Sequence, residues 1–141
     1  MLLKFIHSAF AYMDARIDPP SSLHRMTVKS LREKAETEML VLGHMDQVLV
    51  GCMFCRVETG CLYVGKVAVA PNLQGQGIGK QLFQTAFELA KQHQLSELEL
   101  ETRVELTENH IAFAKLGFKQ TGTSTHNGYN QPTSITMRAK V

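Results

Sequence analysis

The sequence has no long apolar run, no block of basic residues and only three cysteines among its 141 residues. A membrane-spanning helix needs ~20 consecutive apolar residues, so the first absence argues against a membrane protein. Surfaces that bind nucleic acid carry clustered lysine and arginine, whereas this chain has a net charge of only +2. The sequence therefore predicts no contact with nucleic acid and none with a membrane.

The cysteines are too few for a structural metal site. Cys52 and Cys55 lie in an apolar run that predicts a strand, and residues three apart on a strand face opposite sides. A tetrahedral zinc site takes four ligands, and the spacing gives no reason to recruit His44 as the fourth. We therefore expect Cys52, Cys55 and Cys61 to be small buried hydrophobic residues, and we expect no metal.

The N-terminal segment lacks the features of an export signal. It is mildly apolar from Met1 to His7, but no basic segment precedes it, and Tyr12 and Asp14 soon follow. A secretory signal needs a charged start and a clean apolar stretch, so we expect a cytoplasmic protein. Residues 1–141 have the length and the 44% apolar content of one globular domain.

Hydrophobic periodicity predicts alternating helices and strands along the whole chain. The expected helices cover residues 3–14, a segment after an N-cap at Thr27, residues 79–93 and residues 109–116. The expected strands cover residues 39–42, 47–58, 61–70, 95–102, 119–125 and 133–140, with a hairpin turn at 43–46. This order predicts an α/β fold with a mixed, mostly antiparallel sheet that is flanked by helices.

The most specific pattern joins a strand to a helix. Residues 67–80 read VAVAPNLQGQGIGK, an apolar strand followed by a proline-marked turn, a glycine-rich loop and the start of a helix. The first N–H groups of a helix lack intrahelical partners and lie at the positive end of its dipole, so they bind phosphate. Glycine lets the backbone approach such an anion closely.

Two common phosphate-binding motifs do not fit this loop. A P-loop has four residues between its glycines, followed by Lys and then Ser or Thr. Here three residues separate Gly75 from Gly79, and Lys80 is followed by Gln81. The dinucleotide fingerprint G-x-G-x-x-G is one residue longer than this loop. A nucleotide-binding protein is therefore disfavoured.

The loop resembles instead the acyl-CoA loop of the GNAT superfamily of N-acetyltransferases, Q/R-x-x-G-x-G/A, with Gln74, Gly77 and Gly79 at its fixed positions. A second segment, NHIAFAKLGF from Asn109 to Phe118, is similar to the family pattern N-x-x-x-(Y/F)-x-x-x-G-(F/Y). The resemblance implies a GNAT-like acyl-CoA N-acyltransferase fold over nearly the whole chain.

One departure from the family concerns the start of the fold. The family usually opens with a strand before its first helix, and that first strand is apparently missing here, because the sequence begins almost directly in a helix. Either the strand is absent or the true start of the protein lies further upstream. Without that strand, a sheet edge beside Met39–Leu42 would be bare unless the region 129–135 or a second chain covers it. We therefore expect a homodimer.

The resemblance also implies a function. It implies acetyl-CoA as co-substrate and transfer of its acetyl group to a primary amine of a small molecule or protein acceptor. In this family, the residues that match the chain's Val67, Ala68, Val69, Gln74, Gly75, Gln76, Gly77, Ile78, Gly79, Lys80, Asn109 and Phe113 bind the cofactor. The backbone N–H of Val69 would polarise the thioester carbonyl.

The resemblance leaves the general acid open. Family members commonly carry a tyrosine at the position of Phe113 that protonates the departing thiolate, and phenylalanine cannot donate that proton. Read from its residue type alone, Phe113 is a core aromatic. The other candidates for the acid are Tyr63, Tyr129 and His126. A non-catalytic acyl-CoA-binding regulatory module is the alternative function.

The candidate base lies on the strand that follows the long helix. In Ser96–Thr102, leucines alternate with Glu97, Glu99 and Glu101. A strand inside a sheet is usually apolar on both faces, so these carboxylates indicate that one face is wet or lines a cavity. Glu101 is nearest to the cofactor end, and we expect it to act as the base, through water, and to recognise the ammonium. A solvated face without a role is the alternative.

Overall fold

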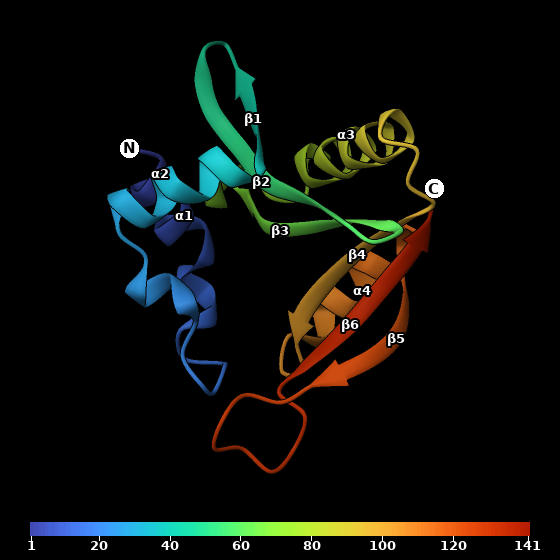
Figure 1. Cartoon of the computed structure of the whole chain (residues 1–141). Helices are drawn as coiled ribbons and strands as arrows, with labels where there is room; N and C mark the ends of the chain where they lie inside the picture. The colour runs from blue at the N-terminus through green and yellow to red at the C-terminus, as the bar shows by residue number, and fades with distance from the viewer.

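The computed structural model describes residues 1–141 and has a six-stranded sheet in the order β1-β2-β3-β4-β6-β5 (Figure 1). All neighbouring strands are antiparallel except β3 and β4, which are parallel. The elements are α1 (Leu2–Phe10), α2 (Val28–Thr37), β1 (Met39–Met45), β2 (Val48–Glu58), β3 (Cys61–Val69), α3 (Ile78–Gln92), β4 (Glu97–Arg103), α4 (Thr107–Lys115), β5 (Lys119–Ser124) and β6 (Ser134–Lys140). The predicted α/β fold with a mostly antiparallel sheet is confirmed.

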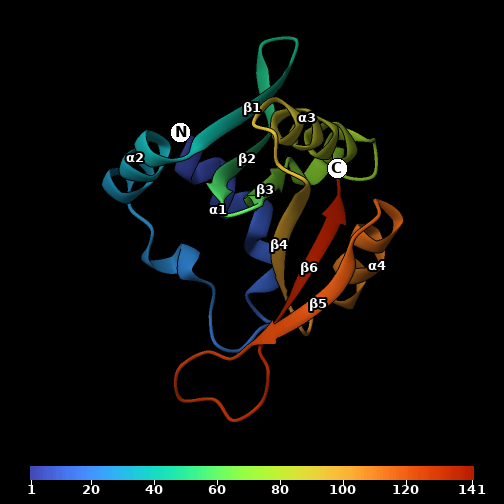
Figure 2. The same ribbon diagram turned by 45° about the vertical axis from the view of Figure 1, so that its right-hand side comes forward.

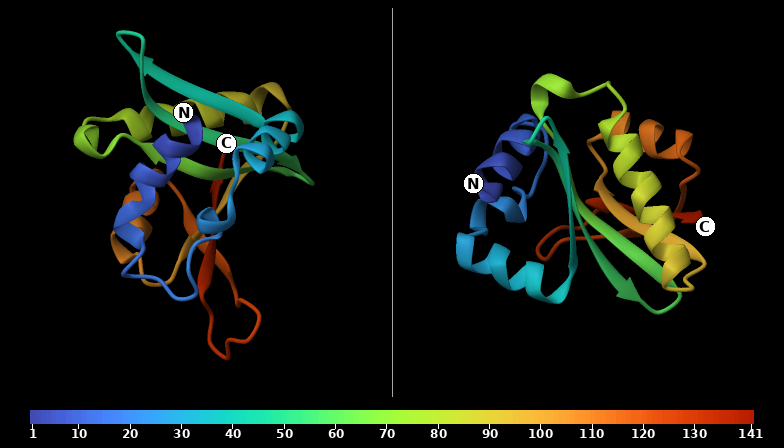
Figure 3. Two further views of the ribbon diagram at one scale, coloured as in Figure 1. Left: turned by 90° about the vertical axis from the view of Figure 1, so that its left-hand side faces the viewer. Right: turned by 90° about the horizontal axis from the view of Figure 1, so that it is seen from above.

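Helices cover both faces of the sheet. Helices α1 and α2 lie on one face, over β1 to β3, and α3 and α4 lie on the other (Figures 2 and 3). Ile6, Leu31 and Phe54 are buried between α1, α2 and the sheet. The larger core lies under α3, which buries Leu82 and Ala86 against β2, β3 and β4. No helix is long and apolar enough to cross a bilayer.

The cysteines belong to these cores, as the sequence predicts. Cys52 packs with the cluster under α1 and α2, whereas Cys55 packs with the cluster under α3, so the two thiols face opposite sides of β2. Cys61 is buried as well. Burial raises the pKa of Cys52 to about 11 and that of Cys55 to about 12, which keeps both thiols protonated and unreactive at neutral pH.

The first hairpin differs from its prediction. Strand β1 continues through Gly43, which pairs with Gly51, and the turn falls on Asp46 and Gln47 between the paired residues Met45 and Val48. Asp46 and Gln47 have φ of 51° and 68°. Two positive φ values are typical of the type I′ turn that matches strand twist. Register against β2 therefore decides the turn, and the glycine of the predicted turn serves as a strand residue.

The edges of the sheet also differ from one expectation. Strand β1 forms one edge of the sheet and β5 forms the other. Residues 129–135 connect to β6, which lies between β4 and β5. Cover of β1 by the chain's own 129–135 segment is therefore wrong, because the whole sheet separates the two.

The parallel pair of strands, β3 and β4, determines where the candidate active site lies. Strands β3 and β4 are joined through α3 and pair only where Cys61–Tyr63 lies beside Glu97–Glu99. Beyond Tyr63 the two strands diverge (Figure 1). In that view they lie close together near the C-terminus of the chain and separate farther from it. The later part of β3 therefore has β2 on one side and an unpaired edge on the other.

Candidate active site

The glycine-rich loop leaves a run of backbone N–H groups free at the start of α3. Gly77 is the N-cap of this helix and makes no side-chain cap. The first helical bond in this region runs from the N–H of Gln81 to the oxygen of Gly77 at 3.0 Å. None of the N–H groups from Gln74 to Lys80 donates to a protein acceptor. They form a site for an anion, because the helix dipole adds positive potential there.

Two glycines in the loop are required by its geometry. Gly75 and Gly77 have φ of 81° and 86°, a region that other residues adopt only with strain. A Cβ built at either position meets no atom within 4 Å. The space outside the loop is therefore open, and a phosphate group can reach the backbone directly.

The unpaired edge of β3 adds a further donor. In an antiparallel ladder, successive residues direct their N–H groups to opposite sides of the strand. The N–H of Ala70 donates to Val50 of β2 at 2.8 Å. The N–H of Val69 therefore points toward the other edge, where β4 no longer pairs. Val67 follows at the irregular pairing of β3 with β2 and also lines this edge.

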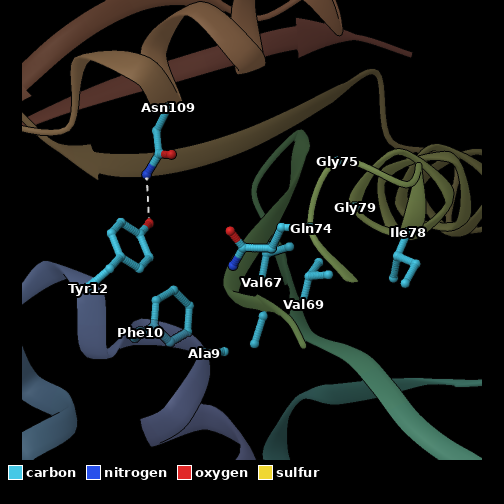
Figure 4. Close-up of a pocket in the computed structure, with 11 residues that line it drawn as sticks. Ala9, Phe10, Tyr12, Val67, Val69, Gln74, Gly75, Ile78, Gly79 and Asn109 are labelled. Carbon is cyan, nitrogen blue, oxygen red and sulfur yellow. Dashed lines mark hydrogen bonds between the residues drawn. The ribbon is translucent and has the colours of Figure 1, made fainter. Parts of the chain in front are cut away.

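The loop and the free edge of β3 line one pocket, here called the loop pocket. It extends from Gly75 and Gly79 along Val69 and Val67 to the side chains of α1 and α4 (Figure 4). Its lining residues are Ala9, Phe10, Tyr12, Val67, Ala68, Val69, Gln74, Gly75, Ile78, Gly79 and Asn109. The predicted Gln76, Gly77 and Lys80 belong to the same loop and first helical turn but do not line the pocket.

Tyr12 is a site residue that the sequence analysis missed. It follows α1 in a short 3₁₀ turn, Ala11–Met13, and its hydroxyl accepts a hydrogen bond from Nδ2 of Asn109 at 3.3 Å. Tyr12 carries the only hydroxyl group among the residues that line the loop pocket. The pair lies at the end of the pocket opposite the glycine-rich loop (Figure 4). No local pattern reveals it, because the two residues are 97 positions apart.

Phe113 lies outside the loop pocket. Its ring packs edge-on against Phe83 and Phe118, with ring centres 5.7 and 6.0 Å apart. The half-buried ring extends the core under α3. This packing agrees with the interpretation of Phe113 as a core aromatic residue.

Polar contacts fasten the wall that carries Tyr12 to the start of α4. Arg16 donates two hydrogen bonds to the carboxylate of Glu108, at 2.6 and 2.7 Å. The N–H of Asp18 donates to Glu105 at 3.0 Å, and Arg103 of β4 donates to the carbonyl of Pro19 at 2.8 Å. We call these contacts the strap. They hold the α1–α2 connection across the gap between β3 and β4.

A second hollow, here called the basic pocket, adjoins the first along β3. Val67–Val69 line the loop pocket, and Tyr63, Gly65 and Lys66 line the basic pocket. The remaining lining residues are Ser22, Arg25, Met26, Ser30, Lys34, Arg56 and Glu101. The two pockets therefore adjoin each other along β3.

Only one of the three predicted carboxylates is free in this region. Arg138 of β6 donates to Glu99 at 2.8 Å and to Glu97 at 3.1 Å, so these two are structural ion pairs. Glu101 is exposed, makes no ion pair and lines the basic pocket. The expectation of a wet strand face therefore holds at Glu101, whereas Arg138 neutralises the other two.

The remaining candidate acids are spread over the molecule. Tyr63 lines the basic pocket beneath the guanidinium of Arg56, and burial, with Glu101 second, raises its pKa to about 12. The hydroxyl of Tyr129 donates to Asp18, and the ring of His126 contacts the hydroxyl of Thr133. Neither Tyr129 nor His126 lines either pocket. No group of three or more His, Cys, Asp or Glu residues could hold a metal ion.

The fold matches solved acetyltransferase structures. The PaiA N-acetyltransferase of Thermoplasma acidophilum, in complex with coenzyme A, superposes with a TM-score of 0.82 at 16% identity, covering 99% of this chain and 91% of that chain. A GNAT family acetyltransferase of Elizabethkingia anophelis with acetyl-CoA bound gives 0.68 at 20% identity, covering 82% and 84%. The IAA acetyltransferase of Bacillus cereus gives 0.68 at 19% identity, covering 96% and 95%.

Sequence comparison identifies the family. No curated protein sequence matches this chain. Residues 7–118, however, match the Acetyltransferase (GNAT) family. That match includes α2, both strands of the parallel pair, the glycine-rich loop and α4. The chain belongs to the GNAT acetyltransferase family.

Proposed function

We propose that the protein transfers the acetyl group of acetyl-CoA to the amine of an acceptor. The observation that carries this proposal is the run of unpartnered N–H groups from Gln74 to Lys80, placed next to the unpaired edge of β3. The first feature suits a pyrophosphate and the second suits an extended amide-containing chain. Coenzyme A has both parts, in that order.

The residues present fit the co-substrate. Acetyl-CoA supplies an activated acetyl group and a thiolate leaving group. The N–H groups of the loop donate to the pyrophosphate, and glycine at 75 and 77 leaves the required open space. The backbone of Val67 and Val69 holds the next part of the molecule along β3, which directs the thioester toward Tyr12 and Asn109.

Three groups then serve the transfer itself. The N–H of Val69 donates to the thioester carbonyl, where negative charge develops. Glu101 accepts a proton from the acceptor ammonium through water, since its carboxylate is free and faces the neighbouring pocket. Tyr12 donates a proton to the departing sulfur. It thus serves as the general acid, a role that Phe113 cannot have because its ring has no proton to donate. Asn109 orients the Tyr12 hydroxyl through their hydrogen bond.

The binding site is tested by Gly77→Val. A valine at φ 86° is strained, and its side chain enters the space that the phosphate needs. We expect the Kd of coenzyme A, measured by calorimetry, to rise at least about tenfold, because ~1.4 kcal/mol of lost phosphate binding already has that effect. Gly60→Val is the matched control, since Gly60 has φ 77° and an equally open surrounding at the β2–β3 turn. Unchanged affinity in Gly77→Val would disprove the site.

Turnover separates the enzyme from the alternative, a regulatory module that binds acyl-CoA without catalysis. The measurement is release of the coenzyme A thiol over a panel of amines, with acetylated product identified by mass spectrometry. Both functions require coenzyme A binding, but only the enzyme releases thiol in proportion to acetylated amine. Binding without amine-dependent release across the panel would favour the module.

A further inference from the structure

The basic pocket carries more positive charge than its own carboxylates balance. Lys34 pairs with Glu38 at 2.6 Å, and Arg56 pairs with Glu58 at 2.8 Å. The other cations of the pocket, Arg25 and Lys66, form no ion pair. These two charges are left for a ligand.

The backbone places Lys66 in this pocket. The register between β2 and β3 shifts between Cys52 and Phe54, and within this bulge Lys66 has φ of 51°. Such a conformation is uncommon for residues other than glycine, and bulges often redirect a side chain beside an active site. The Nζ of Lys66 donates to Ser22 Oγ at 3.1 Å, a neutral partner. The strained residue therefore presents an ammonium group without a counter-ion.

The electric field around Lys66 favours an incoming anion. Burial lowers the pKa of Lys66, and the charges of Lys34 and Arg103 lower it further, with only Glu38 acting in the opposite sense. A bound anion would remove this repulsion and stabilise the charged form. Exposed Arg25 offers the same anion a planar pair of donors.

Glu101 adds a negative charge to a pocket whose other charged residues are cations. It is the only carboxylate among the residues that line the pocket. An ammonium group suits Glu101, whereas an acidic group suits Lys66 and Arg25. The pocket has a volume of about 510 Å³, which lies within the range of small-molecule sites. One small molecule that carries both an ammonium and an acidic group can therefore fit the pocket.

We propose that the basic pocket selects acceptors that carry an anionic group, a carboxylate or a phosphate, on the same molecule as the amine. This inference rests on the proposed acetyl transfer. Lys66 and Arg25 bind the anionic group, which holds the amine near Glu101. The same cations repel polycationic amines, because like charges in a partly buried pocket cost free energy on binding.

Matched pairs of acceptors test the selection. We expect kcat/KM for β-alanine to exceed that for β-alaninamide at least about tenfold, since the two differ only in the carboxylate and tenfold corresponds to ~1.4 kcal/mol. O-phosphoethanolamine against ethanolamine gives the same comparison for phosphate and shows which anion is preferred. Spermidine, a polycationic amine, tests whether the pocket repels cations. Equal or higher kcat/KM for the neutral or cationic members would overturn the proposal.

Substitutions in the basic pocket test whether its cations cause the preference for anionic acceptors. Lys66→Gln and exposed Arg25→Gln should each lower the preference for the anionic member at least about threefold, chiefly through a higher KM. Lys91→Gln on α3, which removes a cation paired with Glu88 and remote from both pockets, should leave the preference unchanged. A preference that survives in both pocket variants would contradict the assignment of these residues.

A binding measurement keeps this inference separate from the proposed function. Calorimetric titration of β-alanine and of β-alaninamide into the protein with coenzyme A present needs no turnover. Tighter binding of β-alanine, weakened in Lys66→Gln, supports the anion site even if no amine is acetylated, in which case acetyl transfer alone fails. Equal binding of the two compounds refutes the anion site whether or not turnover is seen.

Discussion

At the scale of single residues, Tyr12 is the side chain whose chemistry the structure changes most. It carries the only hydroxyl in the loop pocket and lies next to Asn109. Phe113 lies outside this pocket and has no hydroxyl. We expect Tyr12→Phe to lower kcat about 10²-fold, the lower end for a positioned proton donor, with the Kd of coenzyme A within about twofold. Tyr129→Phe is the control, because that hydroxyl contacts Asp18 outside the pocket. An unchanged kcat in Tyr12→Phe would remove this residue from the mechanism.

Glu101 makes a second residue-scale prediction. If it removes the proton from the acceptor, Glu101→Gln should lower kcat by ~10²–10⁴-fold and leave coenzyme A affinity intact. Glu99→Gln is a matched control on the same face of β4, since Glu99 is held by Arg138 rather than facing the pocket alone. Steady-state rates and calorimetry measure the two effects. Equal losses in both variants would mean that charge on this face, and not a base at Glu101, matters.

These residues show why the site was only partly predictable. The loop from Gln74 to Gly79 was identified because the spacing of its glycines is fixed by local backbone geometry, and the structure places it at the start of α3 as expected. Tyr12 was not found, since its meeting with Asn109 depends on the packing of α1 beside α4. The structure also separates Glu101 from Glu97 and Glu99, because the partner strand β6 brings Arg138 to the latter two.

At the scale of elements, the strap decides how firmly the Tyr12 wall is held. Both Arg16 and Glu108 are exposed, so their ion pair adds little to global stability. We expect Glu108→Gln to raise the KM for acetyl-CoA several-fold while the Tm changes by no more than about 2 °C, because an exposed ion pair contributes little to stability. Glu88→Gln, which breaks an exposed pair on α3, is the control. A lower Tm without a change in KM would make the strap purely structural.

The strap also predicts a pH dependence. Hydrogen bonds from Arg16 lower the pKa of Glu108. A carboxyl with a lowered folded-state pKa is stabilising above its unfolded value of ~4.3 and loses that contribution as pH falls through the folded value. Coenzyme A binds the folded protein, so its affinity in wild type should weaken only as the pH falls through the lowered folded-state pKa of Glu108, which lies below about 4.3. Glu108→Gln should lack this part of the dependence, and a parallel pH profile in both proteins would contradict it.

The sequence predicts which segments form helices and strands better than it predicts the residues at which these elements begin and end. The capping box of Thr27 and Ser30 fixes the start of α2, and Thr27 was recognised as its N-cap from residue type alone. Helix α1 ends at Phe10 rather than at Asp14, because the chain tightens into a 3₁₀ turn that brings Tyr12 to the pocket. The first turn falls at Asp46 and Gln47, since pairing with β2 outweighs the local preference of Gly43.

At the scale of the whole molecule, the division of the sheet into two halves creates the candidate active site. The antiparallel group β1–β3 and the group β4–β6 meet only in a short parallel contact. Periodicity predicts each strand but not this divergence, because it depends on where the pairing of β3 with β4 stops in the folded sheet. Both pockets lie along the later part of β3, where the halves separate. The two pockets thus occupy neighbouring stretches of one strand.

The outer edge of the first half leads to the last prediction, a homodimer. Strand β1 is an edge strand without a charged residue, and Leu42, Met45 and Val48 near its tip are 45%, 47% and 62% exposed. Unprotected edges pair with other strands, and two copies of β1 can pair antiparallel about a two-fold axis. We expect light scattering at micromolar concentration to give twice the chain mass of 15.8 kDa. Leu42→Lys should yield monomers, because a charge on an edge strand opposes pairing, whereas Ile111→Lys on exposed α4 should not. A wild-type mass of 15.8 kDa would rule the dimer out.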